Sequence, residues 1–314
     1  MPKPVIAVIG APMDLGAGRR GVDMGPSAVR VANLHTALND LGYKVEDLGN
    51  IEVEQPESIL GRATSPRYLA EIAASCVRLA RLVDKSASAG KFPLILGGDH
   101  SIAAGSIAGL SKFYRKQKKK LGLIWVDAHA DMNTPATSPS GNVHGMPLAA
   151  TIGLGARELT HIGGFSPKID PKNVVLIGIR DVDLKERNTV QSSGVTAFTM
   201  RDVDQLGMRE VMNRAIAIAS NGTAGIHLSF DMDSVDPDDA PGVGTPVRGG
   251  LTYREAHLIM EILNDSGALR SLEVVEVNPV LDTANRTALL AVELISSALG
   301  KKILNSNPHS DVKT

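Results

Sequence analysis

The sequence contains a single cysteine, Cys76, among its 314 residues. One cysteine cannot form a disulfide within the chain, which excludes a disulfide-stapled fold and favours a reducing compartment. The chain also lacks the run of roughly 18 apolar residues that a membrane-spanning helix needs. No apolar signal segment with a cleavage site follows Met1, so we expect a protein of the cytoplasm with no membrane partner.

The chain has little net charge. Lys and Arg total 33 and Asp and Glu total 34, which gives a formal net charge of -1 at pH 7. No overall charge attracts nucleic acid or an anionic membrane, so we predict that neither is a partner. Hydrophobic residues make up 43% of the chain, enough to bury one large core. We predict a single domain over residues 1–304 and a polar, flexible tail over residues 305–314.

Apolar runs of strand length recur along the chain and alternate with stretches of helical spacing. This alternation is typical of an α/β fold in which helices cover both faces of a parallel sheet. We therefore predict a three-layer α/β/α arrangement with about eight strands. The predicted strands are 5–9, 45–48, 92–96, 121–126, 174–179, 195–198, 224–230 and 272–277, and the predicted helices include 26–41, 68–83, 201–218 and 253–263.

Acidic side chains are spaced two residues apart after two of these apolar runs. Asp127, His129 and Asp131 alternate after one run, and Asp231 and Asp233 alternate after a later one. Alternate residues of an extended chain point to the same face. Four converging aspartates would repel one another unless they were protonated or neutralised. Two divalent cations would balance their charge, so the spacing predicts a two-metal site.

Two further polar residues lie near the ends of predicted strands. His100 follows a Gly-Gly-Asp sequence after the third run, and Glu276 lies within the last predicted strand, near its end. Ligands of open α/β sheets bind outside the carboxyl ends of the strands. We therefore expect His100 and Glu276 to join the aspartates in one site. Three long polar connections, which such folds usually keep for function, are 11–26, 132–147 and 234–250.

The donor set bears on the choice of metal. Carboxylates with a minority of imidazoles suit Mn²⁺, whereas Zn²⁺ more often draws His and Cys and Mg²⁺ keeps more water. Two metals about 3.5–4 Å apart can share a water molecule and lower its pKa, which produces a nucleophile at neutral pH. The sequence therefore favours metal-assisted hydrolysis of an electrophilic centre.

Several segments closely resemble the motifs of the arginase/agmatinase (ureohydrolase) family, and the similarity extends from residue 6 to about residue 299. The metal motifs are 97–100, 127–135 and 229–237, and the stretches 140–145 and 249–255 resemble the arginase branch of the family. The resemblance implies hydrolysis of L-arginine to L-ornithine and urea by a metal-bridging hydroxide that attacks the guanidinium carbon. It also implies two Mn²⁺ per chain and a homotrimer or homohexamer.

The resemblance implies a role for each matching residue. One metal would bind His100, Asp127, Asp131 and Asp231, and the other would bind Asp127, His129, Asp231 and Asp233. His144 would shuttle protons, Asp131 would take part in proton transfer to the leaving amine, and Glu276 would pair with the guanidinium. The other substrate contacts would come from Asn133, Ser138, Ser140, Asn142, Asp183, Glu186 and Thr245. Asp183 would face the α-amino group. The dipeptide Ser138-Pro139 departs from the pair of threonines that many family members carry.

Three other functions compete with this interpretation. An agmatinase or another guanidino-acid hydrolase would share the metals, but the 138–142 loop and Asp183 argue for arginine. Phosphoester hydrolysis would need Arg, Lys or helix N-termini around a phosphate, whereas this sequence offers Glu276 and Asp183. A metal-stabilised scaffold or arginine sensor would be marked by the loss of His144 or Glu276, and both are present.

Overall fold

A computed structural model of the chain describes residues 3–59 and 66–304; the tail predicted over residues 305–314 lies outside the described residues. The strands form one sheet in the order β2-β1-β3-β8-β7-β4-β5-β6, and every neighbouring pair is parallel. The strands are β1 (Ile6–Ala11), β2 (Val45–Asn50), β3 (Phe92–Gly97), β4 (Gly122–Val126), β5 (Val174–Ile179), β6 (Thr196–Thr199), β7 (Ile226–Asp231) and β8 (Leu269–Val275).

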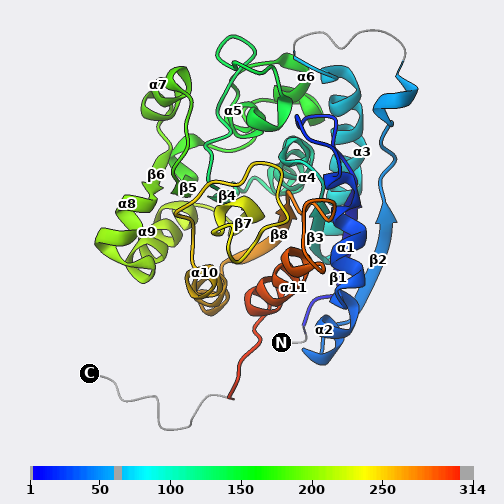
Figure 1. Ribbon diagram of the computed structural model, residues 1–314, viewed down its shortest axis with the longest axis vertical. Coiled ribbons are helices and arrows are strands. Elements are labelled where there is room, and N and C mark those ends of the chain that lie inside the picture. The colour runs from blue at the N-terminus through cyan, green and yellow to red at the C-terminus, as the bar shows by residue number, and fades with distance from the viewer. Residues whose placement is uncertain (1–2, 60–65, 305–314) are drawn as a thin grey trace.

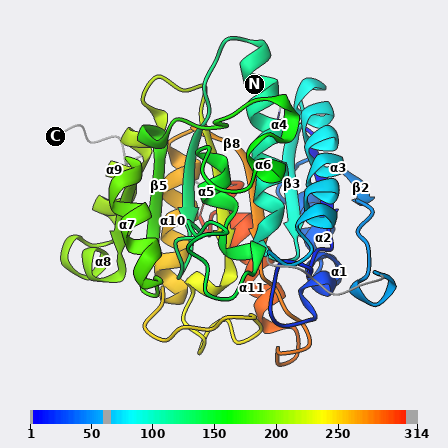
Figure 2. The ribbon, with the colours of Figure 1, turned by 90° about the horizontal axis from the view of Figure 1, so that it is seen from above.

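Helices cover both faces of the sheet (Figure 1), as the view turned by 90° also shows (Figure 2). The helices are α1 (Gly25–Val31), α2 (Leu34–Asp40), α3 (Leu69–Ser88), α4 (Ala103–Lys116), α5 (Pro147–Thr151), α6 (Arg157–Thr160), α7 (Leu184–Ser193), α8 (Met200–Leu206), α9 (Met208–Ser220), α10 (Tyr253–Asp265) and α11 (Arg286–Ala298). One layer contains α3 and α4, and the opposite layer contains α1, α9, α10 and α11. No helix in the described ranges is long and apolar enough to cross a membrane.

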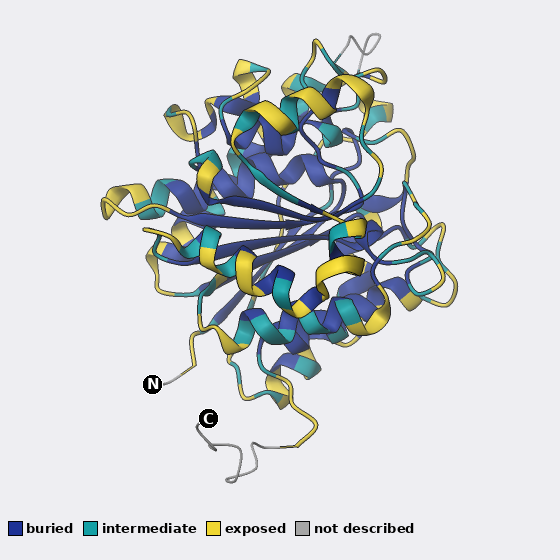
Figure 3. Cartoon of the chain, turned by 90° about the vertical axis from the view of Figure 1, so that its left-hand side faces the viewer, coloured by how far each residue is buried: buried dark blue, intermediate teal, exposed yellow. Residues whose placement is uncertain are grey.

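The alternation of side chains along the strands divides the core in two. Leu94 and Ile124 join the hydrophobic cluster beneath α9, α10 and α11, whereas their neighbours Ile95 and Leu123 join the cluster beneath α3 and α4. Both sheet faces are therefore sealed by apolar contacts, and the strands are dark blue between the helix layers in Figure 3. Because both faces of the sheet are covered by helices, a site for a polar ligand has to lie at the ends of the strands.

The three-layer α/β/α fold is confirmed, and the differences are local. The helix predicted over 26–41 is two helices, because Asn33 adopts a left-handed conformation (φ 65°) between them. The helix predicted over 201–218 is also two, separated at Gly207 (φ 78°). The last strand ends at Val275, so the prediction that Glu276 lies within this strand was wrong. Glu276 is the first residue beyond the strand, where its side chain can turn into the site.

Candidate active site

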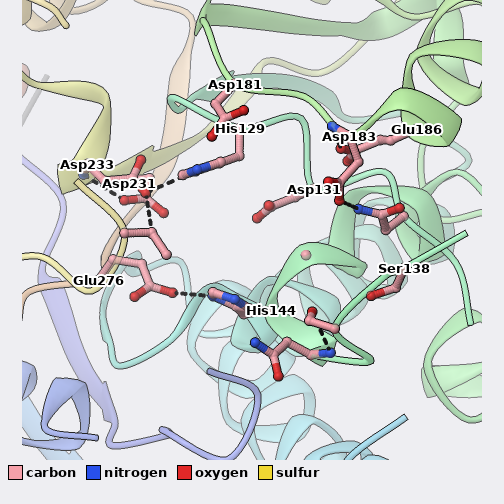
Figure 4. Close-up of a pocket in the computed structure, with 15 residues that line it drawn as sticks. His129, Asp131, Ser138, His144, Asp181, Asp183, Glu186, Asp231, Asp233 and Glu276 are labelled. Atoms are coloured by element: carbon pink, nitrogen blue, oxygen red, sulfur yellow. Dashed lines mark hydrogen bonds and ion pairs between the residues drawn. The ribbon is translucent and has the colours of Figure 1, made fainter. Parts of the chain in front are cut away.

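Strands from the middle of the sheet deliver the acidic and imidazole side chains to its carboxyl edge. His100 begins a 3₁₀ turn (His100–Ile102) just after β3, Asp127 follows β4, Asp231 ends β7 and Glu276 follows β8. These four strands are adjacent in the sheet. Figure 4 shows Asp231, Glu276 and other side chains facing a common cavity. The topology therefore brings together residues that lie up to 176 positions apart in the chain.

An inner group of side chains that could bind a metal surrounds the imidazole of His100. Its Nδ1 lies 3.1 Å from Asp127 Oδ2, 3.2 Å from Asp131 Oδ2 and 3.0 Å from Asp231 Oδ2. On the other side of the ring, His100 Nε2 lies 2.7 Å from Ser229 Oγ. The ring also stacks on Trp125 with a centroid separation of 4.0 Å. These contacts fix the orientation of the imidazole, with Nδ1 directed at three carboxylates.

The outer group of ligands is built on His129. Its Nδ1 lies 3.1 Å from Asp233 Oδ2 and 3.4 Å from Asp127 Oδ1. Asp127 therefore belongs to both groups, with one carboxylate oxygen facing each histidine. The His129 side chain is 26% exposed, whereas that of His100 is 1% exposed. The outer group thus faces the cavity, and the inner group lies deeper in the protein.

The donor chemistry of both groups fits divalent cations. In the described part of the chain, two sets of three metal-ligating side chains come within 4.8 Å, one around His100 and one around His129. His100 Nδ1 is buried and finds no hydrogen-bond partner among the described residues. Burial raises the pKa of Asp231 well above its usual range, and the charges of Asp233 and Asp127 raise it further. A cation between the imidazole and the carboxylates would give His100 Nδ1 a partner. It would also reduce the repulsion among the carboxylates.

Two of the site residues adopt backbone conformations that are rare for side-chain-bearing residues. Asp131 has φ 52° and Glu276 has φ 63°. Such conformations cost on the order of 1–3 kcal/mol and persist when the surrounding structure enforces them. The Asp131 carbonyl accepts a hydrogen bond from Leu148 N at 3.1 Å, and Glu276 N donates to Gly98 O at 2.8 Å. The structure therefore holds both acids in a turned conformation, which directs their carboxylates into the site.

His144 and Glu276 form an ion pair in the wall of the cavity. His144 Nδ1 lies 3.2 Å from Glu276 Oε1, and the same oxygen accepts a hydrogen bond from the backbone N of His100 at 3.0 Å. Burial alone would lower the pKa of His144, but Glu276 outweighs it and the pKa rises to about 9. The imidazole can hold a proton at neutral pH and present it toward the cavity.

The opposite end of the cavity is formed by loops. Asn133 Nδ2 donates to Asp183 Oδ2 at 2.9 Å, which links the loop after β4 to the start of α7. Ser138 Oγ accepts from Gly141 N at 3.0 Å, and the loop carries Ser140 beside it. The structure places every predicted substrate contact on this cavity, namely Asn133, Ser138, Ser140, Asn142, Asp183, Glu186, Thr245 and Glu276.

Glu186 is a buried acid in the first turn of α7, and both its carboxylate oxygens accept hydrogen bonds from backbone. Met132 N donates to Oε1 at 2.7 Å, and Asp183 N donates to Oε2 at 3.3 Å. Burial raises the pKa of Glu186 to about 7. Its carboxylate thus ties the loop after Asp131 to the N-terminus of α7, in addition to lining the cavity.

One acid of the cavity wall had no role in the sequence analysis. Asp181 lines the cavity two residues before Asp183. The signal was present, because Asp181 and Asp183 show after β5 the same two-residue spacing that Asp231 and Asp233 show at the end of β7. The same strand-end argument would have identified Asp181 as a candidate.

The fold and the site define a class of protein: a parallel α/β protein with a carboxylate–imidazole metal centre at the carboxyl edge of its sheet. Residues 5–300 match the family described as "Arginase family". Arginases from Bacillus caldovelox and from Bacillus subtilis (strain 168) are each 52% identical to this chain, and the matches cover 95% of this chain and 99% of each relative. The solved structure of the Bacillus caldovelox arginase superposes with a TM-score of 0.92 at 51% identity, and covers 96% of this chain and 100% of that chain.

The chain belongs to the arginase family. It is a metal-dependent hydrolase, and the predicted family and enzyme class are confirmed. These relatives, which are about half identical to this chain over almost their whole length, are named arginase, which favours the arginase prediction over the agmatinase alternative.

Proposed function

We propose that this chain hydrolyses L-arginine to L-ornithine and urea with two Mn²⁺ bound at the carboxyl edge of the sheet. The observation that carries the proposal is the charge of the cavity wall. It contains seven acidic residues, and no Lys or Arg occurs among the described residues that line it. Such a wall suits metal cations and a guanidinium at one end and an α-amino group at the other, and it does not suit a phosphoester. Relatives of matching length are named arginase, which agrees with this choice.

The metals are proposed to divide between the inner and outer groups, with Asp127 and Asp231 shared. His100 and Asp131 complete the inner set, and His129 and Asp233 complete the outer set. When bound, two such cations lower the pKa of a shared water molecule and supply the nucleophile. Hydrogen bonds orient the buried carboxylates, because Asp127 Oδ2 accepts from Trp125 Nε1 at 2.9 Å and Asp231 Oδ1 accepts from Asp233 N at 2.7 Å.

The protein groups then have separate tasks. Glu276 pairs with the substrate guanidinium and orients it, since a buried carboxylate is stabilised by a cationic partner. Asp131 takes part in proton transfer to the leaving amine, and His144 carries protons between the cavity and solvent. Asp183 faces the α-amino group. The hydroxyls and amides of the loop after β4, together with Glu186 and Thr245, complete the contacts to the substrate.

We also propose that residues 1–304 form one catalytic domain, that the protein works in the cytoplasm, and that it assembles as a homotrimer or homohexamer. The family match over residues 5–300 supports the first of these statements. The other two come from the resemblance to the family.

Urea release from L-arginine, agmatine and 4-guanidinobutyrate, each with and without Mn²⁺, tests the proposed reaction. The expected result is release from L-arginine that depends on the metal and exceeds release from the other two compounds. Faster turnover of agmatine than of L-arginine would contradict the proposal and leave only the wider family.

A further inference from the structure

Arg180 lies directly after β5, outside the proposed ligand set, and its guanidinium binds backbone carbonyls of two other segments. Nη2 donates to Asp233 O at 2.7 Å and to Val247 O at 2.7 Å. Nη1 donates to Ser234 O at 3.0 Å, and Nε donates to Val247 O at 3.2 Å. Arg180 makes no ion pair with a carboxylate within residues 3–59 and 66–304. Its donors therefore hold chain segments together rather than neutralise one particular acid.

The two segments that Arg180 joins meet at the carboxylate of Asp233. Thr245, two residues before Val247, donates from Oγ1 to Asp233 Oδ2 at 2.9 Å. The other carboxylate oxygen accepts from Ala128 N at 3.2 Å. The backbone N of Arg180 in turn donates to Ala128 O at 2.9 Å. Arg180 thus holds Asp233 in three ways. It binds the Asp233 carbonyl, it binds the loop that carries Thr245, and it binds the segment that carries Asp127 and His129.

The surrounding backbone leaves room for the guanidinium. A Cβ atom added to Gly250 would lie 2.7 Å from Arg180 Nη2 and 2.6 Å from Asp236 N. The backbone of Gly250 is not left-handed, so its conformation does not require glycine. The glycine is therefore explained by the close approach of the guanidinium and the backbone of the neighbouring segment.

The geometry calls for arginine in particular. A guanidinium presents five N–H donors in a rigid plane, whereas the lysine ammonium is a point charge on a flexible stem. Burial lowers the pKa of Arg180, and the charges of Asp233 and Asp127 raise it in part, so the cation lies close to the acidic cluster. A lysine at this position could keep the charge but could not span the carbonyls of Asp233 and Val247 in the same way.

We propose that Arg180 is a positioning residue for the outer metal, which it serves by holding Asp233 in place opposite His129. The inference rests on the proposed two-metal function. Groups that orient a metal ligand change metal affinity or activity by roughly 10–100-fold when they are replaced. The inner metal, whose ligands Arg180 does not touch, keeps its affinity.

Mn²⁺ titration of the metal-free full-length protein by calorimetry, with metal analysis after dialysis, tests this proposal. The variants are Arg180→Lys and, as a matched control, Arg214→Lys, an exposed arginine of α9 that pairs with Glu210 at 2.7 Å. We expect two tight sites in the wild type and the control. We expect Arg180→Lys to keep one tight site and to bind the second Mn²⁺ roughly 10–100-fold more weakly. Two sites of wild-type affinity in Arg180→Lys would overturn the proposal.

Two further measurements separate the possible failures. Arg180→Gln keeps a planar donor without the charge and replaces Arg180→Lys if circular dichroism shows that the lysine variant is unfolded. If both variants unfold, the proposal is contradicted, because Arg180 then serves the fold rather than one metal.

Thr245→Val combined with Arg180→Lys should weaken the second site by less than the product of the single effects, because both residues act through Asp233. Fewer than two Mn²⁺ in the wild type would contradict the proposed function itself.

Discussion

The two ends of the cavity are built on different principles. At the metal end, His100, Asp127 and Asp231 come from strand ends and are at most 2% exposed. At the far end, Ser140 and Asp183 lie on connections and are exposed. Strand ends are fixed by the hydrogen bonds of the sheet, whereas loops are fixed by fewer and more local contacts. The comparison teaches that the sheet fixes the buried acids and imidazoles, and we expect the loops to decide which guanidino compound binds.

The same contrast governs electrostatics. Charges at the metal end are shielded from water, so their interactions are strong and an unpaired charge there is costly. Charges at the far end face solvent, which screens them. Substitutions should therefore have large effects on reaction rate at the metal end and smaller effects on substrate choice at the far end.

The largest effect is expected from Asp231→Asn, which removes a shared ligand from the metal end. The variant should lose bound metal and nearly all activity, because an amide cannot replace the charge of a carboxylate between two cations. Asp265→Asn, a change at a side chain that is 66% exposed, is the matched control and should behave as the wild type. Elemental analysis that still finds about two metals per chain in Asp231→Asn would show that the ligand assignment is wrong.

His144→Asn should have the next largest effect. It should lower kcat by roughly 10²–10⁴-fold and keep both metals, because it removes a proton carrier and no ligand. His161→Asn is a control at an exposed histidine. Steady-state kinetics and metal content are measured together. Wild-type turnover of His144→Asn at every pH would mean that proton transfer does not depend on this imidazole.

Asp183→Ala tests the far end. On the wild type, kcat/KM should favour L-arginine over agmatine by on the order of 10²-fold, because agmatine leaves the donors for the carboxylate unpaired, at roughly 1–3 kcal/mol each. Asp183→Ala should raise KM for L-arginine and keep the metals, because it removes the charge opposite the α-amino group. A variant that instead loses metal, or that keeps the wild-type KM, would contradict the claim that the two ends of the cavity have separate roles.

The smallest expected effect is a shift in the titration of His144 when metal binds. Glu276, Asp131 and Asp99 raise the pKa of His144 to about 9, because these acids favour the imidazolium. Cations bound at the metal end oppose that charge, so loading should lower the pKa by about one unit or more, equivalent to about 1.4 kcal/mol. Histidine NMR titrations of both forms measure the shift. A pKa that stays constant or rises on loading would place the cations away from His144.

The sequence predicted most of the fold and of the metal end, because both follow from short-range rules. Continuous apolar runs identify buried parallel strands, and alternate spacing after Val126 or Phe230 orients the aspartates. The breaks at Asn33 and Gly207 were not predicted, although an isolated glycine in a helical stretch was a signal for the second. The strand predicted over 272–277 extended past the end of β8 at Val275, because Val277 beyond that end is also apolar.

The contacts that orient the site could not be read from the sequence. Arg180 binds the carbonyl of Asp233, which lies 53 residues away in the chain, and no spacing rule relates the two. The bond between Asn133 and Asp183 likewise depends on how two loops pack. Such contacts arise from tertiary structure, so the bonds between the far-end loops and the supports of Asp233 were accessible only from the structure.

The most direct test of the two-metal end is reconstitution of the metal-free enzyme. Stepwise addition of Mn²⁺ is followed by urea release from saturating L-arginine and by the bound metal per chain. We predict no activity without metal and a maximal rate that is reached at two Mn²⁺ per chain. A full rate in the absence of divalent cations, or a plateau at one Mn²⁺ per chain, would contradict the proposed two-metal site.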